Sequence, residues 1–202
     1  MSLSRGQSWG GLGGLPNGSE VADTDSELRA IVTAARSAGT DLPTVGLTGG
    51  DLWRTLGGRS SGSGFSDNST RVLVDIGSAL LDGRIHWFVA HLVARHNWLT
   101  GRSWIAANGA HLGRWNLAPR AHPGDGLLDL LDSDLPFRQR LKARRRLHSG
   151  THLPHPGITY TRQPAGQVSF GHPMPVYLDS EPVGAHRIIS VRVEPAVLRL
   201  VL

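Results

Sequence analysis

The amino-acid sequence predicts an α+β fold, in which a small α/β segment packs on an antiparallel β-sandwich. Two helical patterns with a short apolar run between them occupy residues 24–58, which is typical of α/β structure. Many short strand patterns separated by turn residues fill residues 70–202, which is typical of a sandwich or barrel. Residues 59–64 have the Gly- and Ser-rich composition of a flexible linker. We therefore predict an α/β segment at 1–58, a linker at 59–69 and a β-sandwich at 70–202.

The composition is that of a globular protein, with 39% hydrophobic and 18% charged residues among 202. No run approaches 18 apolar residues and the first residues lack the apolar region of a signal peptide, so we expect a cytoplasmic, bacterial protein. The absence of cysteine excludes disulfides, thiolate nucleophiles and cysteine–zinc sites. The net charge of +5 is spread along the chain apart from a cluster at 138–146, so we expect no nucleic-acid partner.

The first helix is predicted from the signals at its two ends. Thr24 and Glu27 form a capping box, in which each side chain can accept a hydrogen bond from a free backbone N–H group. Gly39 follows the helical pattern and suits a helix C-terminus. Between these ends, an apolar stripe at helical spacing is formed by Leu28, Ile31, Val32 and Ala35.

The remaining elements are predicted from periodicity and turn residues. We expect residues 1–22 to be loop, 42–47 to be a short strand and 51–58 to begin a second helix. Asp82-Gly83 indicates a hairpin turn, followed by a strand pattern over 83–94. A basic helix at 135–150 interrupts the later strands, with four predicted apolar anchors: Leu135, Phe137, Leu141 and Leu147.

Several motifs, taken in this order, resemble those of the diacylglycerol kinase-like (YegS-type) bacterial lipid kinase family, from about residue 103 to the end. The family's segment ending in Asn-Asp-Gly-Leu-Leu is similar to residues 118–130, and its Asn-Gly strand end is similar to 105–109. Its late Asp-Gly-Glu-Pro-Leu motif is similar to 178–184, and its closing strand pair is similar to 189–202. The resemblance implies a C-terminal β-sandwich joined to an α/β nucleotide domain.

The N-terminal half departs from the family pattern. The family's nucleotide loop, Gly-Gly-Asp-Gly-Thr, stands ahead of a helix, whereas none of its glycines precede the helix predicted at 25–38. A second motif, similar to Gly-Thr-x-Asn-Asp-Phe-Ala-Arg-x-Leu-Gly, is present in shortened form at 48–58, with matches at Asp51, Arg54, Leu56 and Gly57. The resemblance thus implies a nucleotide domain that is truncated and degenerate at its N-terminus.

The resemblance implies a magnesium site at the turn 122–127. In the family, the residue that matches Asp125 and two backbone carbonyls, here those of His122 and Leu127, hold Mg²⁺. Hard cations prefer oxygen ligands, and a turn flanked by glycines can direct its carbonyl groups inward. The alternative is that Gly124-Asp125-Gly126 is only a turn into a core strand. A metal ion here would be structural and partly hydrated.

The resemblance also implies a catalytic residue, Glu181, which would act as general base on the acceptor hydroxyl. Such a base must lie within hydrogen-bond reach of that hydroxyl. The alternative is a solvated hairpin glutamate, because residues 180–184 have the composition of a turn, and the family's glycine is replaced by Ser180.

The segment 48–58 is the candidate ATP-binding segment. The backbone N–H groups of Gly49, Gly50 and Asp51 at a helix start suit a phosphate group, and Arg54 adds a positive charge. The favoured alternative is a strand-to-helix turn capped by Asp51, since an aspartate at this position disfavours an anion.

Function follows from these candidates. The expected activity is transfer of the γ-phosphoryl group of ATP to a lipid hydroxyl, with Mg²⁺ neutralising the phosphates and Glu181 as base. The alternative is a non-catalytic module that binds a lipid or a partner and has a decayed nucleotide site; a third hypothesis is an oligomer in which a second chain completes that site. The basic cluster at 138–146 is either a solvated helix face or a contact with anionic lipid head groups.

Overall fold

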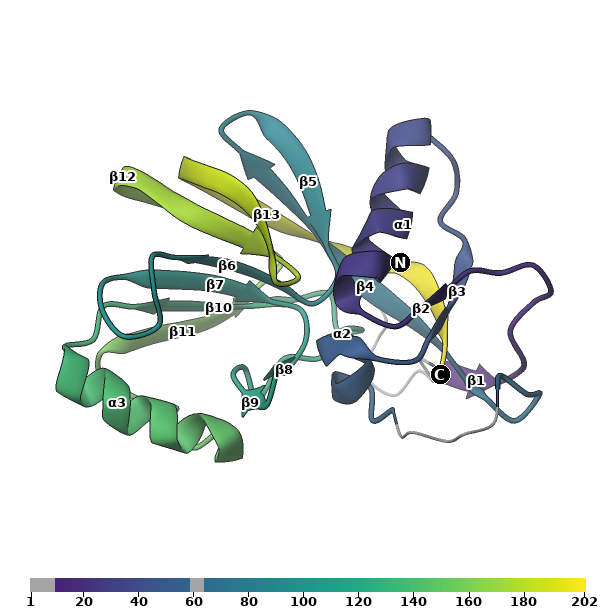
Figure 1. Ribbon diagram of the computed structural model, residues 1–202, viewed down its shortest axis with the longest axis horizontal. Helices are drawn as coiled ribbons and strands as arrows, with labels where there is room; N and C mark the ends of the chain where they lie inside the picture. Colours follow the sequence, from purple (N-terminus) through teal and green to yellow (C-terminus); the bar gives the residue numbers. More distant parts are fainter. Residues whose placement is uncertain (1–9, 59–63) are drawn as a thin grey trace.

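The structure is a computed structural model that describes residues 10–58 and 64–202. The loop predicted at 1–9 and the linker residues 59–63 lie outside the described residues. The remaining chain is α+β and mostly antiparallel sheet, as predicted, with helices at one end and along one side (Figure 1).

The first helix, α1 (Asp25–Ala38), has the predicted ends. The Thr24 hydroxyl accepts a hydrogen bond from the backbone N–H of Glu27 at 3.2 Å, and the Glu27 carboxylate accepts one from the N–H of Asp23 at 2.7 Å. Gly39 ends the helix in the left-handed conformation, with φ of 66°. These local hydrogen bonds explain why the capping signals were sufficient to predict the helix.

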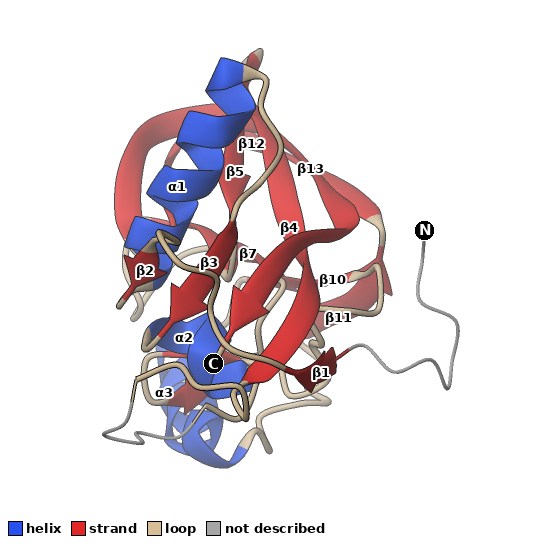
Figure 2. Cartoon of the chain, turned by 90° about the vertical axis from the view of Figure 1, so that its right-hand side faces the viewer, coloured by secondary structure: helices blue, strands red, loops and turns tan. Residues whose placement is uncertain are grey.

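A small parallel unit surrounds α1. Strand β2 (Val21–Ala22) pairs in parallel with β3 (Thr44–Leu47), and α2 (Gly50–Thr55) follows β3 directly. Strand β3 pairs in parallel with the end of the last strand of the chain, so this unit continues the main sheet (Figure 2). The prediction of loop throughout 1–22 was wrong for β2 and for β1 (Gly10–Leu12), because both pair with strands distant in sequence.

The described strands form an eleven-stranded sheet whose main path runs β1-β4-β13-β12-β6-β7-β10-β11, and a separate two-stranded hairpin, β8-β9. The strands of the sandwich are β4 (Thr70–Leu81), β5 (Arg84–Phe88), β6 (His91–Arg95), β7 (Ser103–Ala107), β10 (Leu128–Ser133), β11 (Ile158–Gln163), β12 (Ala165–Leu178) and β13 (Glu181–Val201). The separate hairpin consists of β8 (His111–Leu112) and β9 (Trp115–Asn116).

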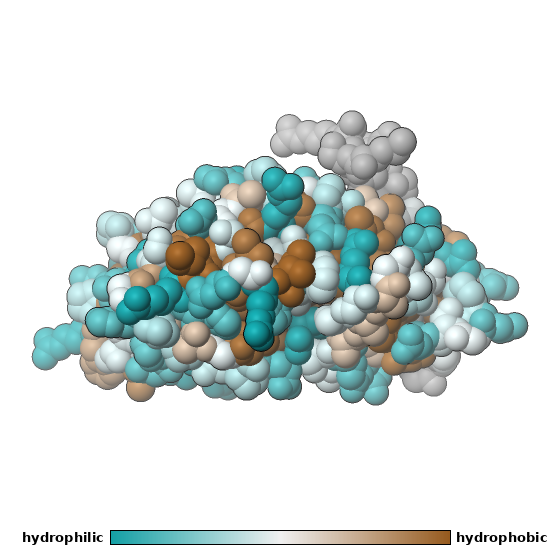
Figure 3. Space-filling model, turned by 90° about the horizontal axis from the view of Figure 1, so that it is seen from above, coloured by the Kyte–Doolittle hydropathy of each residue, from teal (hydrophilic) through white to brown (hydrophobic). Residues whose placement is uncertain are grey.

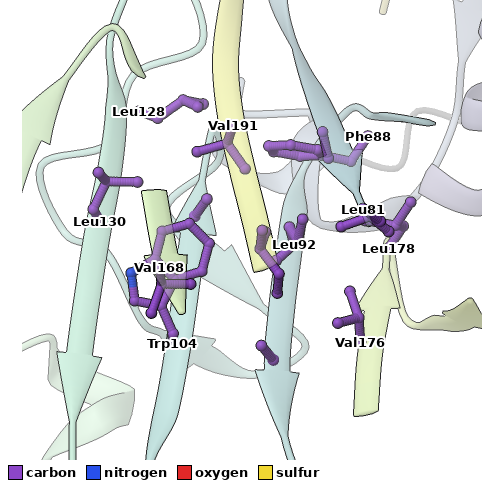
Figure 4. Packing of buried hydrophobic residues seen from close by; sticks show 14 of the residues in the cluster. Leu81, Phe88, Leu92, Trp104, Leu128, Leu130, Val168, Val176, Leu178 and Val191 are labelled. Carbon is purple, nitrogen blue, oxygen red and sulfur yellow. The ribbon is translucent and has the colours of Figure 1, made fainter. Parts of the chain in front are cut away.

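The sheet folds over a buried apolar core to make the sandwich. Figure 4 shows this core, in which side chains from β4 and β5 meet those from β6, β7 and β10, with β12 and β13 between them. A second core lies between α1, α2, β3 and the far ends of β4 and β13. Because β4 and β13 contribute to both cores, the α/β segment and the sandwich share this antiparallel pair of strands.

Two strand predictions were wrong in detail. The run 83–94 is divided into β5 and β6, because the N–H groups of Val89 and Ala90 bind the carboxylate of Asp179 instead of a strand. Conversely, β13 unites the closing strand pair expected at 189–202 across an irregularity between Glu194 and Leu198, and β12 likewise continues through an irregularity in its pairing. Long-range pairing, which leaves little trace in local sequence, decided both outcomes.

The predicted basic helix is present as α3 (Phe137–Arg146), followed by a single turn of 3-10 helix (Leu147–Ser149). Two predicted anchors were wrong: the side chains of Phe137 and Leu141 are 52% and 39% exposed. Arg140 is buried in their place, and its guanidinium donates to the backbone carbonyls of Gly101 and Leu135. The helix is therefore rotated so that part of its apolar surface faces outward.

Candidate functional site

The hairpin between β12 and β13 carries the candidate catalytic residue. Its turn consists of Asp179 and Ser180, which both have positive φ, of 48° and 73°. Glu181 is the first residue of β13 and is exposed. The sequence predicted Glu181 inside a turn at 180–184. In the structure the turn is formed by Asp179 and Ser180, and Glu181 begins the strand that follows.

The turn is fixed by the buried carboxylate of Asp179. It accepts hydrogen bonds from the backbone N–H groups of Val89, Ala90 and His91 at 2.8–2.9 Å. Burial, with a smaller contribution from the charge of Asp25, raises the pKa of Asp179 to about 7. The Arg29 Nε of α1 lies 3.8 Å from the same carboxylate. The hairpin is thereby attached both to the β5–β6 connection and to α1.

The candidate ATP-binding segment is occupied by another side chain of the protein. The carboxylate of Asp25 accepts hydrogen bonds from the N–H groups of Asp51 at 2.5 Å and Leu52 at 3.1 Å. A Cβ atom on Gly49 would lie 2.2 Å from the carbonyl oxygen of Asp23, and Gly50 has φ of 93°, so both glycines are needed for this close approach. Burial raises the pKa of Asp25 to about 6.

The polar side chains of α2 also bind within the protein. The carboxylate of Asp51 accepts the N–H of Gly113 at 2.8 Å, and the guanidinium of Arg54 donates to the carbonyl of the same residue. Two carboxylates, those of Asp25 and Asp51, thus lie where a phosphate was expected, and the N–H groups of Asp51 and Leu52 are already bonded. As the chain is arranged here, these groups do not fit a phosphate.

The candidate magnesium ligands lie in a separate turn. One carboxylate oxygen of Asp125 accepts the N–H of Leu127 at 3.0 Å, and the other pairs with Arg162 of β11. The carbonyl of His122 accepts the N–H of Gly124 at 2.8 Å. Arg162 also donates to Asp129 at 2.8 Å. Within residues 10–58 and 64–202, no group of three or more His, Cys, Asp or Glu side chains is arranged to hold a metal ion.

The donor set at 122–127 therefore does not fit Mg²⁺ in this arrangement. The positive charge that a metal ion would supply to Asp125 comes from the guanidinium of Arg162. We assign no step of a reaction to a metal at this turn.

A cavity that the sequence did not predict lies beside the hairpin turn. It has a volume of about 330 Å³ and is lined by Ser180, by Gly113 and by the aromatic and arginine side chains of Arg95, Trp98, Arg114, Trp115 and Tyr177. Gly113 is the residue bound by α2, so the cavity lies between the candidate ATP-binding segment and the hairpin of Glu181. The signal that could have found it is the clustering of Arg and Trp in and around β6 and β9.

A smaller apolar pocket adjoins this cavity. It has a volume of about 70 Å³, lies between α3 and the sheet, and includes Leu117, Leu131 and Leu147 in its lining. Trp98 and Trp115 line both spaces, and their rings meet edge to face with centroids 5.2 Å apart. The polar cavity and the apolar pocket thus share an aromatic wall.

Comparison with known proteins identifies the family. The sequence model of the YegS C-terminal NAD kinase beta sandwich-like domain matches residues 78–202, more than half of the chain. The chain belongs to the YegS-type, lipid kinase-like family. No curated protein matches the sequence.

Solved structures agree on the fold. A candidate diacylglycerol kinase from Bacillus anthracis strain Sterne superposes with a TM-score of 0.66 at 12% identity, covering 90% of this chain and 76% of that chain. A second such structure gives 0.59 at 13% identity and covers 79% and 69%. A third, named a diacylglycerol kinase, gives 0.54 at 12% identity and covers 79% and 67%. The match extends into the α/β segment, since the first structure covers nine tenths of the chain.

Proposed function

We propose that this protein binds a lipid with a free hydroxyl group and promotes phosphoryl transfer from ATP to that hydroxyl. The observation that carries the proposal is the position of the hairpin turn. Ser180 lines a cavity with aromatic walls, and the exposed carboxylate-bearing residue Glu181 follows it directly. The cavity supplies room for a lipid, and the neighbouring carboxylate supplies a proton acceptor.

In the proposed reaction, the lipid hydroxyl oxygen forms a bond to the γ-phosphorus of ATP, and the bond from that phosphorus to ADP breaks. The hydroxyl proton passes to the carboxylate of Glu181. A positioned general base of this kind contributes roughly 10²–10⁴-fold to the rate. Magnesium bound to the nucleotide would neutralise the phosphate charge.

A second candidate function is lipid binding without catalysis. The observation that favours it is the Asp25 carboxylate on the N–H groups of Asp51 and Leu52, since a nucleotide phosphate there would have to displace an internal anion. The two candidates share the lipid and differ only in ATP.

Calorimetric titration with Mg-ATP separates them, followed by transfer of radiolabelled phosphate to a panel of hydroxyl lipids. The first candidate requires ATP binding and labelled lipid, with activity lost in Glu181→Gln because that variant cannot accept the proton. Glu20→Gln is the matched control, because Glu20 is also exposed and lies in the α/β segment. Lipid binding without any heat from millimolar Mg-ATP would establish the non-catalytic function, and full activity of Glu181→Gln would remove Glu181 from its role.

We further propose that α3 contacts an anionic membrane surface. Its exposed apolar side chains, Phe137 and Leu141, lie one turn apart, and Arg138, Lys142 and Arg145 are exposed on the same helix. Apolar groups that enter the interface and flanking cations are the two contributions that hold such helices on lipid, at about 1 kcal/mol for each basic residue. Figure 3 shows the molecule from above, on the side away from α3 in Figure 1, where apolar side chains form several patches among polar ones.

Vesicle flotation tests this surface. Among the described residues, no helix is both long and apolar enough to cross a membrane. Phe137→Ser with Arg145→Glu is expected to reduce binding to anionic vesicles by at least tenfold. Ile85→Ser with Arg84→Glu on β5 is the control, because both residues are exposed on another face. Equal binding by both double variants would contradict the proposal.

A further inference from the structure

Arg95, at the end of β6, holds a guanidinium group between two aromatic rings. The guanidinium carbon lies 4.3 Å from the centroid of the Trp98 ring and 4.7 Å from that of Tyr177. Within the described residues, its Nε atom is buried without a hydrogen-bond partner, and no carboxylate forms an ion pair with it. The rings fix the position of the charge but leave the edge of the guanidinium without an acceptor.

Three arginines elsewhere in the protein are arranged differently. Arg36, Arg102 and Arg162 each pair with a carboxylate at 2.9 Å or less. A partly desolvated charge without an opposite charge is unfavourable, and burial lowers the pKa of Arg95 accordingly. A guanidinium that is held flat on aromatic rings and lacks an anion is suited to receive one from outside.

The surroundings of Arg95 indicate which kind of anion. Arg114, from the turn between β8 and β9, brings a second positive charge to the same cavity. Acidic residues near the cavity are Asp51, which is bonded to the cavity residue Gly113, and Asp179 and Glu181, which flank Ser180; none of the three lines the cavity. Trp98 and Trp115 provide an apolar wall, with the apolar pocket under α3 on its other side.

We propose that this cavity binds the anionic head group of a lipid, with a phosphate or carboxylate on Arg95 and Arg114 and the start of the apolar chain along Trp98 and Trp115. A guanidinium edge donates two parallel hydrogen bonds to such a group, which favours phosphate and carboxylate over neutral esters. The inference rests on the proposed lipid-binding function and narrows it. The lipid that the protein prefers carries this anionic group in addition to the hydroxyl that would accept the phosphoryl group, so it is a charged phospholipid rather than neutral diacylglycerol. Phosphatidic acid, the probe used below, has no free hydroxyl and reports on the head-group contacts alone.

The test compares three probes in calorimetric titrations of the full chain: dioctanoyl phosphatidic acid, dioctanoylglycerol and inorganic phosphate, each below its aggregation concentration. We expect phosphatidic acid to bind at least tenfold more tightly than either of the others. Arg95→Met keeps an apolar chain between the rings and removes the charge, so it is expected to lose roughly ten- to a hundredfold in affinity for phosphatidic acid, as for other hydrogen bonds to charged groups. Its affinity for dioctanoylglycerol, which carries no anionic group, should fall by much less.

Two further variants keep the test decisive. Arg84→Gln on β5 is the matched control, because Arg84 is exposed and remote from the cavity, and it is expected to bind all probes as the wild type does. Arg114→Gln lies in an exposed turn and is expected to lose severalfold in affinity even if Arg95→Met does not fold. Equal affinity for phosphatidic acid and dioctanoylglycerol, or unchanged binding in Arg114→Gln, would overturn the inference. Phosphate binding as tightly as phosphatidic acid would show a free-phosphate site instead.

The outcomes also separate this inference from the proposed function. If dioctanoylglycerol is bound and phosphorylated but phosphatidic acid is not preferred, the head-group site is wrong and the kinase function stands. If phosphatidic acid binds through Arg95 while Mg-ATP gives no heat, the head-group site stands and the kinase function is wrong.

Discussion

Two kinds of charged region occur in this protein, and they differ in what balances their charge. At the start of α2 and in the 122–127 turn, the balancing group belongs to the chain itself: backbone N–H groups meet Asp25, and Asp125 meets Arg162. In the cavity beside the hairpin turn, Arg95 has no such carboxylate within the described residues. We call the first two regions closed, because their charges are balanced within the chain, and the cavity open, because the charge of Arg95 is not. The closed regions are those that resemble family sites, whereas the open region was absent from the sequence prediction.

The difference has an energetic consequence. A ligand that enters a closed region must displace a partner that is already bonded, so its binding energy is reduced by the energy of that internal contact. A ligand that enters the open region replaces water and relieves a poorly balanced charge. Resemblance to a motif therefore predicts where the chain makes its turns, and an unbalanced charge predicts where a ligand binds.

The largest effect on the free energy of unfolding is expected from removing Arg162, which pairs with Asp125 in the 122–127 turn. Arg162→Met would leave the carboxylate of Asp129, which is buried, with only the Tyr160 hydroxyl as side-chain partner. Loss of one member of a buried ion pair costs about 3 kcal/mol or more in the free energy of unfolding. Urea denaturation of the variant and the wild type measures this difference.

Magnesium provides the sharper comparison on the same variant. We expect millimolar Mg²⁺ to leave the melting temperature of the wild type unchanged and to raise that of Arg162→Met, in which the Asp125 oxygens are released. Arg162→Lys, which keeps a positive charge, should show a smaller loss of stability and little response to Mg²⁺. A wild-type melting temperature that rises with Mg²⁺ and falls again with chelator would contradict this comparison, because it would show that the folded wild type binds Mg²⁺.

The sequence predicted those features whose causes are local. The ends of α1 depend on contacts within four residues, and the hairpin at Asp82-Gly83 depends on two positive φ angles, of 44° and 91°. The turn around Asp125 was likewise recognised from its two glycines. Such features leave a signature in neighbouring residues, which is why the fold class and the family could be predicted from the chain alone.

The partners of the candidate site residues could not be predicted in this way. Asp25 lies 26 residues from Asp51, and Arg162 lies 37 residues from Asp125, so only the folded sheet brings them together. The same is true of Arg95 and Tyr177, which meet because β6 pairs with β12. The sequence therefore identified residues that resemble a site, and the tertiary structure decided what each of them binds.

The smallest effect on the free energy of unfolding is expected from a change of pH. It acts through two buried carboxylates, that of Asp25 at the start of α2 and that of Asp179 in the hairpin turn. Asp25 and Asp179 have pKa values of about 6 and about 7, above the ordinary value of 3.8, because both are buried and each carries the same charge. Between pH 4 and 7 the folded protein therefore holds more protons at these groups than the unfolded chain does. Their contribution to stability is complete below pH 4 and is lost as the pH rises to about 7.

Histidines with a lowered pKa change the stability in the opposite direction as the pH rises. The wild-type curve therefore does not isolate the contribution of the carboxylates, and a variant is required. Burial lowers the pKa of His91 to about 4, and stability from such a group increases as the pH rises towards 6.5. Asp25→Asn removes one acidic contribution and keeps an oxygen to accept a hydrogen bond from α2. From pH 4.5 to 7.5, the wild type is expected to lose on the order of 2 kcal/mol relative to this variant, measured by urea denaturation. Asp41→Asn, at an exposed position, is the control and should follow the wild type. Parallel curves for Asp25→Asn and the wild type would mean that Asp25 is charged in the folded protein throughout this range, and that the start of α2 holds a stable anion of the chain's own.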